Sequence, residues 1–230
     1  MKIESLRELI LNSNNIVFFG GAGVSTESGI PDFRSENGIY NTVREYGYSP
    51  EVILSHTFFL SHTDIFFDYY KKNLIFTSAK PNKAHLALAT LEKKGKLKAV
   101  VTQNIDGLHQ MAGSKNVLEL HGSIHRNHCM NCREKYSLEY ILNSPEIIPK
   151  CSKCGGIVKP DVTLYEESLD MDTLNTAVAC ISKADMLIVG GTSLAVYPAA
   201  GLIDYYSGRK LVLINKSSTP YDSRANLIIH

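Results

Sequence analysis

The sequence lacks several features that would assign it to a specialised class of protein. It has no tryptophan among its 230 residues, and no apolar run approaches the roughly 20 residues that a membrane-spanning helix needs. Charge of neither sign is in excess, since 24 basic and 23 acidic residues give a formal net charge of +1 at pH 7. We therefore expect neither a membrane protein nor a protein that binds nucleic acid through general electrostatic attraction.

Cysteine is scarce, but its spacing is informative. Of five cysteines, four form two Cys-x-x-Cys pairs, Cys129 with Cys132 and Cys151 with Cys154. Two such pairs supply four thiolates for one tetrahedral Zn²⁺, a closed structural site. A pair of redox dithiols is the alternative, and it lacks the usual strand-to-helix context. This cysteine usage predicts a cytoplasmic protein, as does an N-terminus patterned as an amphipathic helix instead of a signal peptide.

The stretch from residue 16 to residue 34 is the most informative part of the chain. An apolar run, residues 16–19, leads into the turn Gly21-Ala22-Gly23. A strand, a glycine turn and a helix start bind the diphosphate of a dinucleotide in many α/β proteins. The third glycine of the usual fingerprint is missing, so this spacing alone is weak evidence. The loop Pro31-Asp32-Phe33-Arg34 then brings together a carboxylate, an aromatic ring and a guanidinium.

Further apolar runs predict buried strands at residues 98–102, 117–120, 186–190 and 211–215. Polar or glycine-rich residues end these runs or follow them, and ligands of open α/β sheets bind at the carboxyl ends of strands. We therefore expect the polar tips to meet at one edge of the sheet. The tips are Gln103-Asn104-Ile105-Asp106, His121, Gly191-Thr192-Ser193 and Asn215.

The predicted fold class is α/β, a doubly wound (Rossmann-like) parallel sheet with a small zinc-binding module inserted. Residues 1–122 and 157–230 are expected to form the dinucleotide-binding domain, and residues 123–156 the zinc-binding module. Residues 157–167 are expected to return to the sheet in extended form. The aromatic-rich segment at about 35–80 predicts short helices that form a lid over a pocket, with most of its rings packed beneath it.

Taken in order along the chain, these motifs resemble those of the sirtuins, the NAD-dependent protein lysine deacylases. The matching residues are 21–25, 28–34, 102–106, 121–122, the four paired cysteines, 191–194 and Asn215. The resemblance implies removal of acetyl, and possibly other apolar acyl, groups from lysines of proteins or peptides. Nicotinamide and O-acyl-ADP-ribose would be the products. It also implies NAD as a co-substrate and zinc as a structural metal.

The resemblance further implies a role for each site residue. His121 would be the general base that takes a proton from a ribose hydroxyl, which suits a group that titrates near neutral pH. Asn104 would be the second catalytic residue, holding a water. Phe33 would shield the reacting ribose carbon from water. The implied NAD-binding residues are Gly21, Ala22, Thr26, Asp32, Phe33 and Arg34, then Gln103, Asn104, Ile105 and Asp106 on the nicotinamide side, and Thr192, Ser193 and Asn215 on the adenosine side.

The sequence departs from the pattern of the family, or of some of its members, in several places. Tyr165-Glu166-Glu167 stands where the family usually has Phe-Gly-Glu, on a strand that would pair with the substrate peptide. Asp68 and Lys71 take the positions of a Tyr-x-x-Arg pair that binds succinyl or malonyl groups, which predicts an acidic acyl pocket that repels such groups. The chain ends at His230, where the family usually continues through a final strand and helix, so part of the sheet's cover is expected to be missing.

Two other functions fit parts of the pattern. A mono-ADP-ribosyltransferase would cleave the same bond of NAD but would not require the assistance of His121. A non-catalytic zinc-ribbon module for interaction or nucleic-acid binding would explain the cysteines alone. The near-neutral charge argues against that reading, and we expect no specific nucleic-acid binding.

Overall fold

The computed structural model describes residues 1–31 and 42–230. The helices (α), 3-10 helices (η) and strands (β) in these ranges are, in chain order, α1 (Lys2–Leu11), β1 (Ile16–Gly20), η1 (Ala22–Val24), η2 (Thr26–Ser28), α3 (Pro50–Ile53), α4 (His56–Ser61), α5 (Thr63–Asn73), α6 (Lys83–Lys93), β2 (Leu97–Thr102), α7 (Leu108–Met111), β3 (Val117–Glu119), β4 (Gly122–Cys129), β5 (Lys135–Tyr136), α8 (Leu138–Leu142), β6 (Val158–Val162), α9 (Met171–Lys183), β7 (Met186–Gly190), η3 (Ala199–Tyr205), β8 (Leu211–Ile214), η4 (Asp222–Arg224) and β9 (Leu227–Ile229).

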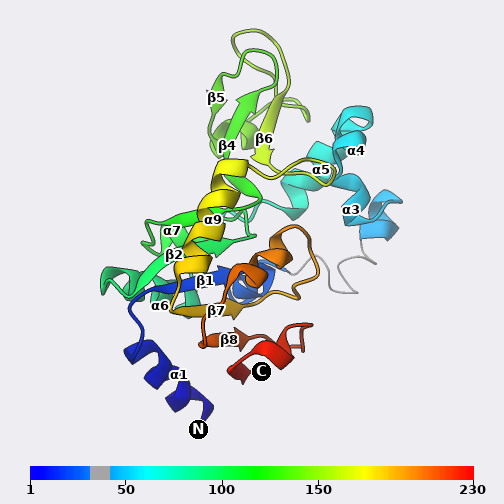
Figure 1. The fold of residues 1–230 in the computed structure, drawn as a ribbon. Helices are drawn as coiled ribbons and strands as arrows, with labels where there is room; N and C mark the ends of the chain where they lie inside the picture. The colour runs from blue at the N-terminus through cyan, green and yellow to red at the C-terminus, as the bar shows by residue number, and fades with distance from the viewer. Residues whose placement is uncertain (32–41) are drawn as a thin grey trace.

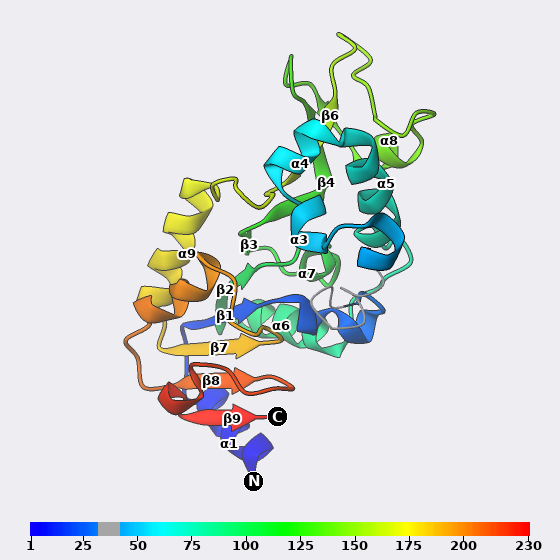
Figure 2. The same ribbon diagram turned by 90° about the vertical axis from the view of Figure 1, so that its right-hand side faces the viewer.

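A parallel sheet forms the larger part of the molecule. Within the described ranges its strands follow the order β3-β2-β1-β7-β8-β9 (Figure 2). Counted along the chain this is 3-2-1-4-5-6, the doubly wound arrangement, and the order reverses between β1 and β7. Strand β1 pairs with β7 from Ile16 opposite Met186 to Gly20 opposite Gly190, so both strands end at the same edge. The predicted fold class is confirmed.

The outer strand β9 corrects one prediction. It pairs in parallel with β8, with Leu213 opposite Ile228. Sequence reasoning predicted no strand after residue 215, so it missed β9. Three residues form this strand, and a run as short as Leu-Ile-Ile gives little periodicity to recognise in the sequence.

Alternation along the strands explains why both faces of the sheet are covered. In β1, Val17 and Phe19 point to the face that α9 and η3 cover, while Ile16 and Phe18 point to the face that α1 and α6 cover. Figures 1 and 2 show α9 and α6 on opposite sides of the sheet. Strands buried on both faces appear as continuous apolar runs, which is how the sequence predicted them. We call this part, with its covering helices, the sheet lobe.

A second, smaller sheet lies above the first in Figure 1 and is antiparallel, in the order β5-β4-β6. Strand β6 pairs with β4, so the expectation that residues 157–167 rejoin the parallel sheet is wrong. Aromatic rings of α4 and α5 share one core with Cys129 and Val158 of this sheet and Ile141 of α8. We call α3–α5, β4–β6, α8 and the loops between them the small lobe.

None of the helices in the described part of the chain is both long and apolar enough to cross a lipid bilayer.

Candidate functional site

A cavity of about 290 Å³ opens between the sheet lobe and the small lobe. The predicted site residues that line it are Ala22, Gln103, Asn104, Ile105, Asp106 and His121. A second hollow shares Ala22, Asn104 and His121 with the first and continues over Gly21, Thr192 and Ser193. The structure thus brings most of the predicted residues to one cleft beside the reversal of strand order.

Two glycine turns make close contact at that reversal. The N–H of Gly23 donates to the carbonyl of Gly191 at 2.8 Å, and a Cβ on Gly23 would lie 2.8 Å from the Cα of Gly191. The predicted helix start is present, but as the 3-10 helices η1 and η2 of three residues each, which are too short for a strong helix dipole. A helix dipole therefore does not support diphosphate binding here, whereas the close backbone packing that glycine permits does.

Ser25 links two of the predicted residues and is itself only 1% exposed. Its hydroxyl donates to Asp106 Oδ2 at 2.6 Å and accepts from Asn104 Nδ2 at 3.1 Å. The other oxygen of Asp106 accepts from the N–H of Leu108 at 2.9 Å. These contacts fix the orientation of both functional side chains. Sequence reasoning assigned Ser25 no role, because only the fold places it between residues about 80 positions away.

His121 follows β3 and faces both hollows. Its Nδ1 lies 2.9 Å from the carbonyl oxygen of Gln103. Because a carbonyl oxygen only accepts, Nδ1 carries a proton, and Nε2 is the nitrogen that accepts whenever the ring holds a single proton. The carbonyl of His121 accepts from the N–H of Thr163 at 3.0 Å, which ties this residue to the end of β6.

The remaining predicted residues are less uniformly placed. Gln103 Nε2 donates to Thr192 Oγ1 at 3.1 Å, which joins the two strand tips. Thr26 and Asn215 are not among the residues that line either hollow. Thr26 Oγ1 donates to the carbonyl of Gly23, and Asn215 Nδ2 donates to that of Ser217. Asp32, Phe33 and Arg34 lie outside the described residues.

Apolar side chains form much of the cavity wall, and sequence reasoning missed most of them. They include Leu54, Leu74, Val162, Leu164 and Leu169. Asp68, expected in an acyl pocket, instead accepts from Tyr46 Oη and Lys72 Nζ and is not among the lining residues. Lys71 is not among them either; its Nζ donates to the carbonyl of Glu146. The prediction that Asp68 and Lys71 lie in the acyl pocket is therefore wrong.

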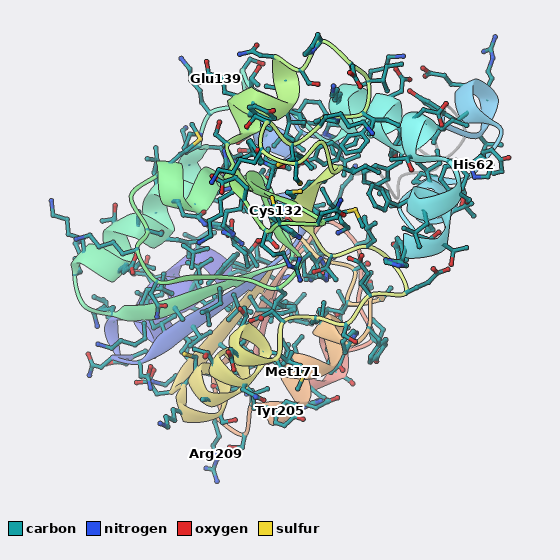
Figure 3. All side chains as sticks on the ribbon, turned by 90° about the horizontal axis from the view of Figure 1, so that it is seen from above. His62, Cys132, Glu139, Met171, Tyr205 and Arg209 are labelled. Carbon is teal, nitrogen blue, oxygen red and sulfur yellow. The ribbon has the colours of Figure 1, made fainter. Side chains whose placement is uncertain are left out.

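The four paired cysteines converge in the small lobe, where Figure 3 labels Cys132. Their sulfur atoms all lie within 4.8 Å of one another, and the Cys129–Cys154 and Cys132–Cys151 pairs are 3.4 and 3.5 Å apart. Four sulfurs at about 2.3 Å from one Zn²⁺ would be about 3.8 Å apart, so the donor set fits this metal. A hydrogen bond from Tyr136 lowers the pKa of the Cys151 thiol to about 6.

Comparisons with known proteins agree with this geometry. The model of the Sir2 family matches residues 21–198. An NAD-dependent protein deacetylase of Clostridium tetani is 66% identical over 99% of this chain and 92% of its own length. One of Clostridium acetobutylicum is 64% identical over 99% and 93%. A solved Sir2 structure with p53 peptide and NAD+ is 41% identical, has a TM-score of 0.88, and covers 100% of this chain and 92% of its own. The chain belongs to the Sir2 family.

Proposed function

We propose that this protein is an NAD-dependent protein deacetylase that removes acetyl, and other apolar acyl, groups from lysine side chains. The observation that carries this proposal is that Asn104, Asp106 and His121 line one cavity beside the reversal of strand order. Relatives that share about two thirds of the sequence are named NAD-dependent protein deacetylases. A structural neighbour holds a deacetylated p53 peptide with 3'-O-acetyl ADP ribose.

The side chains of the cavity suit this reaction. Bound NAD supplies a ribose activated by the bond to its nicotinamide leaving group. Asn104 and Asp106, both fixed by Ser25, would orient the nicotinamide and its ribose. His121 Nε2 would accept the proton of a ribose hydroxyl, and the carbonyl of Gln103 would stabilise the positive charge that the ring then carries.

The apolar wall supports the choice of acyl group. Leu54, Leu74 and Leu164 offer no donor that could bind a second carboxylate. Acetyl and longer apolar chains are therefore favoured over succinyl or malonyl groups. A structural neighbour with 41% identity binds a propionylated peptide.

We further infer that the partners are acetyl-lysine segments of cytoplasmic proteins. The cytoplasmic setting is supported by the four clustered cysteines, whose donor set suits zinc and a reducing compartment. The absence of specific nucleic-acid binding stays a prediction.

The test compares wild type with His121→Ala on a synthetic acetyl-lysine peptide in the presence of NAD. We expect kcat for lysine unmasking to fall at least about 100-fold, as for loss of a general base. His62→Ala, on the outer side of the small lobe (Figure 3), is the control and should stay within about twofold of wild type. Unchanged turnover in His121→Ala would refute the proposed role. Mass spectra that show ADP-ribosylated protein with the acetyl group intact would instead identify an ADP-ribosyltransferase.

A further inference from the structure

The segment from Val162 to Glu167 forms one wall of the cavity, opposite the strand tips of the sheet lobe. Two of its side chains, Val162 and Leu164, are buried in the small lobe. Tyr165 is 39% exposed, and Glu166 is exposed as well. With so little apolar burial, this wall needs other contacts to hold one conformation.

Glu167 supplies several of those contacts through one carboxylate. Its Oε1 lies 2.9 Å from His56 Nδ1 on α4. Its Oε2 accepts from the N–H of Leu164 at 2.9 Å and from Lys159 Nζ at 3.3 Å. The carboxylate therefore connects the wall to α4 on one side and to β6 on the other.

Lys159 is unusual because it is a lysine with only 9% of its surface exposed. Its ammonium also donates to the carbonyl of Val162 at 3.1 Å and lies 5.9 Å from the centre of the Phe59 ring. A buried ammonium is costly unless its charge is balanced. Glu167 provides that balance. Because Lys159 also donates to the carbonyl of Val162, it connects the two ends of the wall, Val162 and Glu167.

Glu166 adds a second attachment to α4. Its Oε2 accepts from the N–H and the hydroxyl of Thr57 at 2.9 and 2.7 Å. Glu166 has a φ of +74°, a backbone conformation that favours glycine. Between these carboxylates, the backbone of Tyr165 bonds to Leu54 and His56, so that the wall and the start of α4 form one continuous structure.

We propose that Glu167 is a positioning residue: with Lys159 and His56 it holds the cavity wall at residues 162–167 in the conformation that receives the acyl-lysine peptide. The proposal rests on the proposed function for its substrate. It assigns Glu167 no contact with NAD and no proton transfer. A wall fixed before the peptide arrives lowers the ordering cost of binding.

The experiment compares Glu167→Ala and Glu167→Gln with wild type and with the control Glu139→Gln on α8, at the outer side of the small lobe (Figure 3). We expect Glu167→Ala to raise KM for the acetyl-lysine peptide about tenfold, because charge-assisted hydrogen bonds are lost. KM for NAD should stay within about twofold. Glu167→Gln should lie between, because an amide oxygen can still accept from Leu164. The control should match wild type.

Hydrogen exchange supplies a readout that does not depend on activity. In Glu167→Ala the amide of Leu164 should exchange at least about tenfold faster, while the amides of β1 and β7 stay protected. If KM for the peptide matches that of the control, or rises together with KM for NAD, the proposal is wrong. If wild type fails to deacetylate any peptide, the proposed function fails, and Leu164 exchange still decides whether Glu167 holds the wall.

Discussion

The sheet lobe and the small lobe reach stability by different routes. The sheet lobe buries both faces of a parallel sheet, and α9 alone contributes 13 residues to its cover. In the small lobe β5 has two residues, α3 four and α8 five. Helices and strands this short are not stable alone. The small lobe depends on its aromatic core and on its four cysteines. A change at one of these features should therefore destabilise the small lobe and leave the sheet lobe folded.

Removal of the metal should have the largest effect, and it should destabilise the small lobe but not the sheet lobe. Cys129→Ala, or a strong chelator, takes away a binding free energy of about 10 kcal/mol or more in isolated zinc modules. We expect the amides of Ile124 and Cys129 in β4 to lose protection while those of Val17 and Val189 keep it. Hydrogen exchange with mass spectrometry checks this, with Cys180→Ala as the control. Uniform loss of protection in both lobes would contradict it.

Gly122 is the first residue of β4, where the chain passes from the sheet lobe into the small lobe. Its φ is +76°, and a Cβ there would lie 1.9 Å from the carbonyl oxygen of Asp161, which as backbone cannot move aside. We expect Gly122→Ala to lower the free energy of unfolding by about 3 kcal/mol or more. The control is Gly155→Ala, with a φ of +71° and no atom within 4 Å of the new Cβ, which should cost about 1 kcal/mol. If urea unfolding shows the same loss of unfolding free energy in both variants, the contact between the new Cβ and the carbonyl of Asp161 does not destabilise the protein.

The smallest expected effect is the pH dependence of stability that His109 causes. This side chain packs against Phe18 in the sheet lobe. Burial, and to a lesser extent the neighbouring His85, lowers the pKa of His109 to about 3. The unfolded chain therefore binds a proton between about pH 6.5 and pH 3 that the folded chain excludes. The contribution of His109 to the free energy of unfolding is therefore fully present above pH 6.5. It decreases as the pH falls, by about 2 kcal/mol between pH 7.5 and pH 5.

His109→Phe should remove this part of the pH dependence, since a phenyl ring keeps the contact with Phe18. Urea midpoints at pH 7.5 and pH 5 measure it, with His62→Phe as the control that keeps the wild-type dependence. An unchanged difference between the two midpoints would refute the assignment to His109.

Sequence reasoning succeeded where one local pattern determines the outcome. The runs at 98–102, 186–190 and 211–215 became β2, β7 and β8, because strands covered on both faces need unbroken apolar residues. The spacing of the four cysteines likewise predicted a cluster that the fold brings together.

It failed where distant partners decide. Strand β6 is extended as expected, but its pairing with β4 depends on a neighbour that periodicity does not reveal. Asp68 was assigned to the cavity from its position in the aligned motif. In the structure its carboxylate instead accepts hydrogen bonds from Tyr46 and Lys72. The roles of Ser25 and Glu167 were likewise hidden, since their partners lie far away in the sequence.

The positions at which β4 begins and ends have a consequence for how the protein can be inactivated. The strand begins at Gly122, directly after His121, and ends at Cys129, a cysteine of the metal cluster. One extended run of eight residues therefore connects the proposed base with a cysteine cluster whose exposed members, Cys132 and Cys154, can be reached by oxidants and electrophiles. A reagent that never enters the NAD cleft can thus disable the enzyme from a distance, by loosening the far end of the strand whose near end holds the imidazole.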